Sequence, residues 1–265
     1  MKQSDLLKML TYRRPAGSKM ELEFIRRYID PVPGMYTDAY GNRILLCKGS
    51  KVMIACHTDT VHSKGGKQVV SVTNGFAHLP TDSTSSTSNC LGADDTAGVY
   101  AALRMIKAGV KATFVFHRAE EIGGRGSTWL ELNYPRWIAS FDVCLSLDRR
   151  GTTDIITSQY GGNTASDDFA HSLASALKMK HKPAAGIFTD SANYAHLIPE
   201  CSNLSVGYAH EHTRAECLNL KYLEEVIEKL IGVNWDGLTI ARDLMADKME
   251  EAKYREVEDD GIEYY

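Results

Sequence analysis

The chain lacks any long basic run, any interleaving of basic and aromatic residues, and any apolar stretch long enough to span a membrane. Its formal net charge is -4 and its pI is about 6.1. Nucleic-acid-binding proteins usually carry a clustered basic face, and a membrane-spanning helix needs about 20 apolar residues. We therefore expect neither a nucleic acid nor a membrane as a partner.

Paired cysteines and a signal peptide are also lacking. The six cysteines show no Cys-x-x-Cys spacing, and three of them lie in or beside apolar, strand-like runs, as buried free thiols do. The first residues, MKQSDLLKMLTYRR, have no apolar core of the kind that signal peptides carry and are typical of a helix. Both observations predict a cytoplasmic protein.

No internal repeat and no convincing linker divides the chain, so we expect residues 1–265 to form a single domain. Residues 248–265 are acidic and are expected to form a frayed tail. The segment Pro80–Asn89, PTDSTSSTSN, has too little apolar content to pack. A surface loop is the favoured interpretation, and a flap over a site is the alternative.

Strand-like and helical patterns alternate along the chain. Helices are predicted from Ser18 to about Ile29, from Asp95 to about Lys107, over Ala165–Met179 and from about Leu220. Four runs are apolar on both faces, as strands buried between two layers are: Val52–Cys56, Ala112–Phe116, Phe141–Leu147 and Asn203–Gly207. This order predicts an α/β fold, a three-layer α/β/α sandwich with a mixed, largely parallel central sheet.

Side chains that bind metals follow the ends of these buried strands, where ligands gather in parallel sheets. They are His57 and Asp59, Glu120 and Glu121, Asp148, and His210 and His212, joined by Asp94 and Asp95 at the start of a helix. Carboxylates gathered in a buried place repel one another unless cations or protons intervene. Two divalent metal ions would neutralise such a cluster.

The donors are oxygen and nitrogen without thiolate, which suits Zn, Co or Mn in a catalytic site better than a structural zinc. A catalytic two-metal site needs a bridging carboxylate, a His and a carboxylate for each ion, open positions for water, and a further carboxylate that takes a proton from that water. The adjacent pair Glu120-Glu121 offers both a base and a ligand.

Five segments occur in a characteristic order: HTDTV, LGADDTAG, the Glu-Glu of HRAEEIGG, SLD and HTRAE. This ordered set resembles the signature of the di-zinc exopeptidase clan, which includes the M28 aminopeptidases, the M20 peptidases such as peptidase T, and the M42 aminopeptidases. The similarity extends from Asp38 to Glu216, most of the chain. It implies a zinc-exopeptidase-like fold.

The resemblance also implies a role for each site residue. His57 and Asp148 would hold one ion, Glu121 and His212 the other, and Asp94 would bridge the two. His212 is preferred over His210 because His-Thr-Arg-Ala-Glu repeats the clan's spacing of His and Glu.

Two further residues acquire catalytic roles by the same resemblance. Glu120 would be the general base and later the acid that protonates the leaving amine. Asp59 would accept the second ring N–H of His57 and fix its tautomer. Asp95 is not expected to be a ligand, and the bond between Asp94 and Asp95 is expected to be cis, as is common in this clan.

Within this clan the chain resembles the M28 aminopeptidases more than the M20 peptidases. The span from Asp148 to His212 has no room for the M20 lid domain, and GIFTDSANY resembles an M28 segment near the site. With no lid histidine, either a tyrosine or a backbone N–H would stabilise the oxyanion, and Tyr160 is the candidate tyrosine. Arg149 and Arg150 would either bind a substrate carboxylate or screen the acidic cluster.

The predicted function is that of a metal-dependent exopeptidase, an aminopeptidase, which hydrolyses a peptide bond with water activated by two metal ions and Glu120. One alternative is an N-acyl amino-acid amidohydrolase or a glutaminyl-cyclase-like acyl transferase that uses the same site on a small amide substrate. A non-catalytic binding module is a further alternative. The sequence leaves the oligomeric state open.

Overall fold

The computed structural model describes residues 1–81 and 87–247. The predicted acidic tail, 248–265, and the centre of the Ser/Thr-rich loop, 82–86, lie outside the described residues. Within the described ranges, no helix combines the length and the apolar character that crossing a membrane requires.

A mixed sheet of nine strands forms the centre of the molecule, in the order β11-β10-β13-β9-β4-β8-β3-β2, with β12 paired to β10. Its strands are β2 (Tyr36–Thr37), β3 (Arg43–Leu45), β4 (Val52–His57), β8 (Thr113–His117), β9 (Val143–Arg149), β10 (Asp154–Gln159), β11 (Gly162–Asn163), β12 (Lys182–Gly186) and β13 (Glu200–Ser205). The four central strands, β13, β9, β4 and β8, are mutually parallel. Antiparallel strands border them on both sides.

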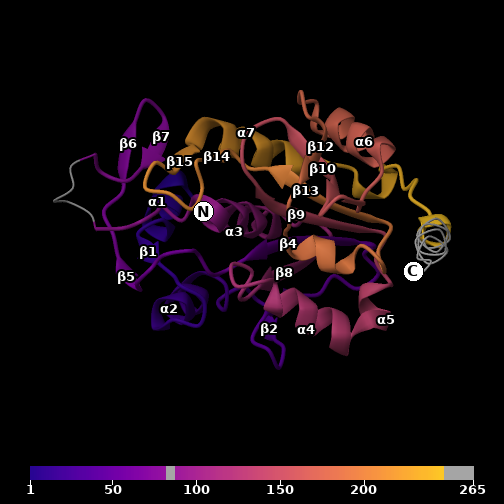
Figure 1. Cartoon of the computed structure of the whole chain (residues 1–265), viewed down its shortest axis with the longest axis horizontal. Helices are drawn as coiled ribbons and strands as arrows, with labels where there is room; N and C mark the ends of the chain where they lie inside the picture. Colours follow the sequence, from indigo (N-terminus) through magenta and orange to yellow (C-terminus); the bar gives the residue numbers. More distant parts are fainter. Residues whose placement is uncertain (82–86, 248–265) are drawn as a thin grey trace, which may run out of the picture.

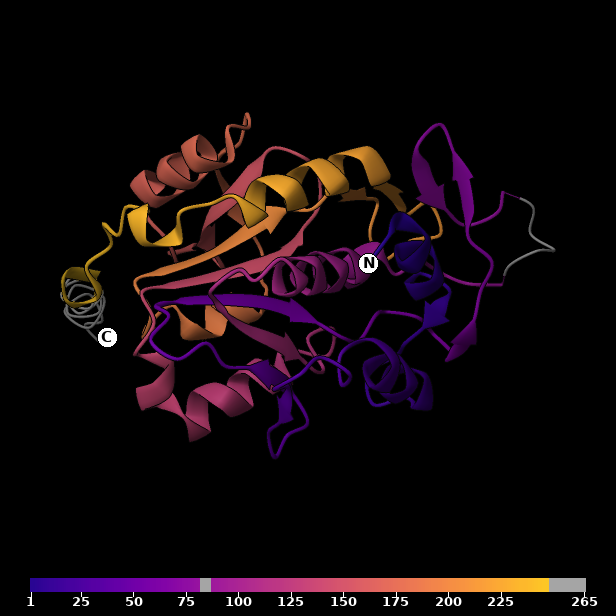
Figure 2. The same cartoon turned by 180° about the vertical axis from the view of Figure 1, so that it is seen from behind.

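Helices cover both faces of this sheet. They are α1 (Gln3–Met9), α2 (Lys19–Tyr28), α3 (Ala93–Lys107), α4 (Arg125–Asn133), α5 (Pro135–Ile138), α6 (Asp167–Leu177) and α7 (Leu220–Ile231), with short 3₁₀ helices η1 (Asp190–Tyr194) and η2 (Trp235–Gly237). Figure 1 places α6 and α7 above the sheet and α4 and α5 below it, and Figure 2 shows the same separation from behind. The predicted three-layer α/β/α sandwich is confirmed.

The alternation of side chains along β4 explains the two covered faces. All six of its residues are buried. Ile54 and Cys56 belong to the larger core, shared with α3 and α7, whereas Met53 and Ala55 belong to a second core shared with α4, α5 and η1. Successive side chains of a strand point to opposite faces, so a continuously apolar strand is stable only between two helical layers.

Two smaller sheets flank the main one. The first, in the order β14-β15-β7-β6, is built from β6 (Ser71–Thr73), β7 (Phe76–His78), β14 (Tyr208–Ala209) and β15 (Cys217–Asn219). The second pairs β1 (Tyr12–Arg13) with β5 (Gly66–Lys67). The first lies at the left of Figure 1, next to the N-terminal end of α3. It joins segments that are far apart in the sequence.

Several predicted elements are confirmed. Ser18 caps α2, and its hydroxyl accepts a hydrogen bond of 3.1 Å from the Glu21 N–H. Helix α7 begins at Leu220 and ends against Gly232. The run Gln68–Val72 also predicts a strand from its sequence, and this prediction is wrong, because the chain forms β5 and β6 on either side of a gap there. Strand β12 was not predicted, since its sequence, KPAAG, has little β character.

Candidate metal centre

Parallel strands bring His57 and Asp148 to the same edge of the sheet. His57 is the last residue of β4, and Asp148 lies near the end of the adjacent strand β9. The Nε2 atom of His57 lies 3.6 Å from Oδ1 of Asp148 and 3.1 Å from Oδ1 of Asp94. Asp94 comes from the first turn of α3, which packs against β4 and β9. These three side chains form a first group of metal donors.

Asp94 also belongs to a second group of donors, with Glu121 and His212. The Nε2 atom of His212 lies 3.1 Å from Oδ2 of Asp94 and 3.2 Å from Oε2 of Glu121. Each oxygen of the Asp94 carboxylate therefore faces a different histidine. A carboxylate shared between two groups in this way has the geometry of a bridge between two metal ions.

The structure distinguishes between His210 and His212 as candidate metal ligands. His212 meets Asp94 and Glu121, as described above, whereas His210 is exposed and belongs to neither donor group. Both residues have positive φ angles, +58° at His210 and +63° at His212. This left-handed turn aims the His212 side chain at the cluster.

Asp59 holds the loop that carries Glu120 and Glu121. Its two carboxylate oxygens accept the backbone N–H groups of these residues, each at 3.2 Å. The Nδ1 atom of His57 lies 3.2 Å from the main-chain oxygen of Asp59 and 3.6 Å from its Oδ1. The carbonyl is thus the nearer acceptor for the ring N–H, and the carboxylate, within 3.6 Å of the ring, also positions the two glutamates.

Residues of both donor groups line a cavity of the protein. Glu120 lines this cavity as well but belongs to neither donor group. Its Oε2 lies 3.9 Å from Nε2 of His57. Its neighbour Glu121 contacts His212. The two adjacent glutamates therefore present their carboxylates to different partners, one outside the donor groups and one within them.

Two buried carboxylates that sequence reasoning left without a role hold the backbone of the centre. Glu216 accepts the N–H groups of Leu91, Gly92 and Asp94 at 2.8, 2.8 and 3.0 Å. Asp95 accepts the backbone N–H of His57 at 3.1 Å. The expected cis bond between Asp94 and Asp95 is confirmed. The HTRAE motif drew attention to Glu216. It could not predict that this carboxylate bonds to the backbone of Asp94, 122 residues away in the sequence.

We expect Glu216→Gln to destabilise the fold and the centre together. An amide offers one acceptor oxygen where the carboxylate offers two, so at least one buried N–H loses its partner, at about 1–3 kcal/mol. Because Glu216 fixes the Asp94 backbone, zinc affinity should also fall, by about 10- to 100-fold. Urea denaturation and zinc titration measure the two effects. The exposed Glu228→Gln is the control, and wild-type values for Glu216→Gln would contradict the positioning role.

Three side chains fix Asp148 from the opposite side. Thr189 and Tyr208 donate hydroxyl hydrogen bonds to Oδ2 and Oδ1 of its carboxylate, at 2.8 and 3.0 Å. Asn203 bonds to both its N–H and its carbonyl. Tyr160, the tyrosine expected near the oxyanion, is 74% exposed and does not line the cavity. Tyr208, by contrast, lines the cavity and contacts Asp148.

Burial and crowding perturb the acid–base properties of the cluster. Burial raises the pKa of Asp148 to about 7, and the nearby Asp94 carboxylate adds to this shift. Burial likewise raises the pKa of Glu120 well above its usual range. Hydrogen bonds to Asp94 and Glu121 raise the pKa of His212 to about 11. Burial opposes ionisation of Asp94, but the bonds from His212 and His57 outweigh it and hold its pKa below the usual range.

The donor set fits two divalent cations. Imidazole nitrogen and carboxylate oxygen are suitable ligands for zinc and similar ions, and the two groups share one carboxylate. The buried Oε1 of Glu121 has no hydrogen-bond partner among the described residues. Such an oxygen is costly unless a cation or a proton satisfies it. The buried carboxylates of the centre also outnumber its histidines, and bound cations or protons would balance their negative charge.

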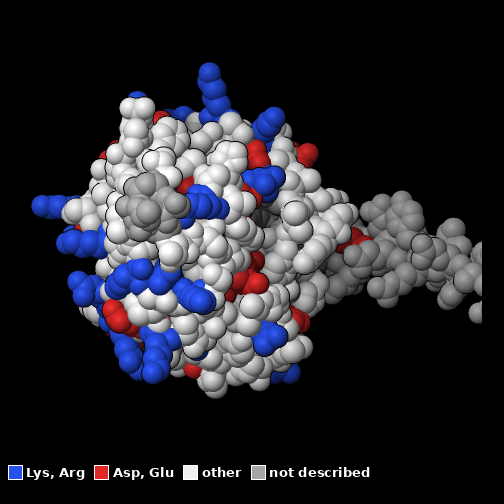
Figure 3. All heavy atoms as spheres, turned by 60° about the vertical axis from the view of Figure 1, so that its left-hand side comes forward, with Lys and Arg blue, Asp and Glu red and all other residues white. Residues whose placement is uncertain are grey.

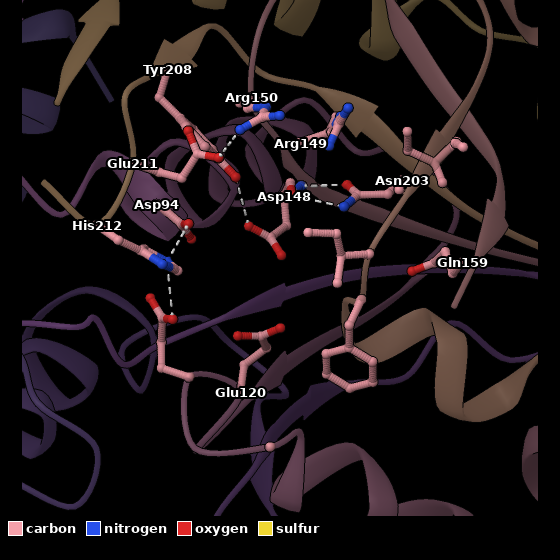
Figure 4. A pocket seen from close by; sticks show the side chains of 17 residues that line it. Asp94, Glu120, Asp148, Arg149, Arg150, Gln159, Asn203, Tyr208, Glu211 and His212 are labelled. Carbon is pink, nitrogen blue, oxygen red and sulfur yellow. Dashed lines mark hydrogen bonds and ion pairs between the residues drawn. The ribbon is translucent and has the colours of Figure 1, made fainter. Parts of the chain in front are cut away.

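The candidate centre opens into a cavity of about 480 Å³. Asp94, Glu120, Glu121, Asp148 and His212 line one end of it (Figure 4). Figure 3 shows acidic side chains meeting in a recess of the molecular surface, with Lys and Arg side chains nearby. A volume of this size accommodates a small ligand or a few residues of a peptide.

No protein-family model matches the chain. No curated protein matches it either. Solved structures with a similar fold include the aminopeptidase PepT from Bacillus cereus, with a TM-score of 0.69 and 14% identity over 87% of this chain and 96% of that chain. A tripeptidase from Staphylococcus aureus gives a TM-score of 0.68 and 13% identity over 87% and 96%.

A third similar structure is the TET1 peptidase of Pyrococcus horikoshii, with a TM-score of 0.63 and 18% identity over 87% of this chain and 98% of that chain. At such identities the likeness shows a shared fold. The chain thus has the fold of these peptidases, with the mixed, largely parallel sheet expected of a zinc exopeptidase.

Proposed function

We propose that this protein is a metal-dependent aminopeptidase that removes residues from the amino end of short peptides. The observation that carries the proposal is the pair of donor groups joined through Asp94, with the Glu120 carboxylate in the same cavity but outside both groups. The peptidases of similar fold support it. Two divalent ions, zinc or the similar ions Co and Mn, would supply Lewis acidity toward the scissile carbonyl and the attacking water.

The side chains of the protein would carry out the remaining steps. His57 and Asp148, with Asp94, would hold one ion, and Glu121 and His212, again with Asp94, would hold the other. Glu120 would take a proton from the attacking water as its oxygen bonds to the carbonyl carbon. The same proton would pass to the amine nitrogen as the C–N bond breaks, which returns Glu120 to its ionised form.

Further parts of the proposal rest on weaker sequence signals. Kinship with the M28 group is supported by the Thr-Asp-Ser segment, because Thr189 bonds to Asp148 and so belongs to the centre. A cytoplasmic location is supported by six free cysteines, four of them buried. A single catalytic domain is supported by a main core that draws on residues from Leu6 to Leu238.

Mass-spectrometric mapping of cleavage tests the aminopeptidase proposal. Zinc-loaded protein would be incubated with free-amine, N-acetylated and C-terminally amidated forms of the same peptides, with chelator-treated protein as the control. We expect stepwise loss of N-terminal residues from free-amine peptides alone, and no cleavage after chelation. Release of acyl groups would instead favour an amidohydrolase, and trimming from the carboxyl end a carboxypeptidase. No cleavage by zinc-loaded protein would point to a binding module.

A further inference from the structure

Basic and apolar side chains also line the cavity that contains the candidate centre. Arg149, Arg150, Ile156, Gln159, Ile187 and Phe188 also line the cavity, and so does Glu211, the partner of Arg150. Figure 4 shows Arg149 and Gln159 on the side of the cavity away from His212 and Asp94. Besides the carboxylates of the centre, the cavity therefore presents two guanidinium groups and several apolar side chains.

Within the described part of the chain, the arginines pair with carboxylates other than those of the acidic centre. Arg149 donates Nε and Nη2 to the same oxygen of Asp154, at 3.1 and 2.9 Å, and Asp154 does not line the cavity. Arg150 donates Nη1 to Oε1 of Glu211 at 2.9 Å. Over residues 1–81 and 87–247, no ion pair joins either arginine to a carboxylate of the two donor groups or to Glu120. Pairing with the carboxylates of the centre therefore does not explain why both arginines line the cavity.

Both guanidinium groups keep donors for a ligand. Arg149 Nη1, and Nε and Nη2 of Arg150, have no acceptor within the described part of the chain. The Arg149 side chain is only 19% exposed and Asp154 fixes its orientation, whereas Arg150 is 57% exposed and can adjust. Guanidinium groups bind planar carboxylates through paired N–H groups.

We propose that Arg149 and Arg150 bind a carboxylate of the substrate, an inference that rests on the hydrolase function proposed above. The substrate class is then anionic peptides or related amides. The carboxylate is either the side chain of an acidic N-terminal residue or the terminal carboxylate of a dipeptide. Ile187 and Phe188 supply an apolar wall against which the alkyl part of such a ligand packs.

Two matched pairs of peptides test this inference and separate the two sources. Glu-Gly-amide and Gln-Gly-amide differ only in the side-chain carboxylate, and Leu-Gly and Leu-Gly-amide differ only at the carboxyl end. For zinc-loaded protein we expect kcat/KM to favour the carboxylate member of one pair by about 10- to 100-fold, the strength of a hydrogen bond to a charged group.

Arg150→Gln should reduce that ratio toward one. Arg136→Gln removes an exposed arginine on α5 that does not line the cavity, so it should keep the wild-type ratio. Cleavage of all four peptides without preference in either pair would overturn the inference and leave the aminopeptidase proposal intact. A preference that survives in Arg150→Gln and in Arg149→Gln would overturn it as well.

Complete absence of cleavage would instead contradict the hydrolase function. In that case the four peptides serve as stable ligands for isothermal titration calorimetry with the same zinc-loaded proteins. Tighter binding of the carboxylate member of a pair, lost in Arg150→Gln, would support recognition by the arginines. Equal binding within both pairs would overturn it.

Discussion

Glu120→Gln is expected to slow peptide hydrolysis by on the order of a hundred- to ten-thousand-fold, the usual effect of removing a general acid–base group. Glutamine has almost the same shape but cannot take the proton of the attacking water. Glu120 belongs to neither donor group, so the protein should still fold and bind two zinc ions. Steady-state kinetics and zinc titration measure the two properties on one sample.

The neighbouring residue provides the matched contrast. Glu121→Gln makes the same chemical change one position along the chain, but Glu121 meets His212 at 3.2 Å within a donor group. It should therefore lose zinc affinity as well as activity. Near-normal turnover in Glu120→Gln would remove Glu120 from the role of base. Equal loss of zinc in both variants would show that the two carboxylates are not divided between base and ligand.

Asp94→Asn is expected to abolish the two-ion centre. The two oxygens of Asp94 each lie 3.1 Å from a different histidine nitrogen, so an asparagine leaves only one oxygen for two groups. Losing a residue that only orients a ligand costs about 10- to 100-fold in metal affinity, and loss of a shared ligand should cost at least that much. We expect fewer than two zinc ions per chain at micromolar zinc and at least about 100-fold lower activity.

The exposed Asp168→Asn is the control for this change, because it alters one carboxylate on α6 that lies outside both donor groups. It should keep both ions and full activity. If Asp94→Asn retained two ions with unchanged affinity, Asp94 would not be the residue that joins the two groups.

Much of the fold could be predicted from the sequence because buried parallel strands have a distinctive composition. The continuous apolar runs at β4, β8 and β9 indicated strands covered on both faces, and their ends pointed to His57, Glu120, Glu121 and Asp148. The parallel arrangement then brings those ends to one edge. Local pattern was sufficient here because the period of the side chains and the position of a strand end are local properties.

Contacts between distant segments could not be predicted in the same way. Glu216 reaches the start of α3, and Tyr208 reaches Asp148, through turns whose course depends on the small sheet β14-β15-β7-β6. The nearer acceptor for His57 is the Asp59 carbonyl, a main-chain atom that no side-chain motif specifies. Tyr160 was the tyrosine named from the sequence as a candidate near the oxyanion, yet the chain leaves it largely exposed.

Anomalous X-ray diffraction at the zinc absorption edge, from crystals grown with zinc, tests the central claim most directly. Two peaks about 3.5–4 Å apart are expected on either side of the Asp94 carboxylate. One should lie beside His57 and Asp148, and the other beside Glu121 and His212. A single peak, or peaks away from Asp94, would contradict a two-ion centre built on this shared carboxylate.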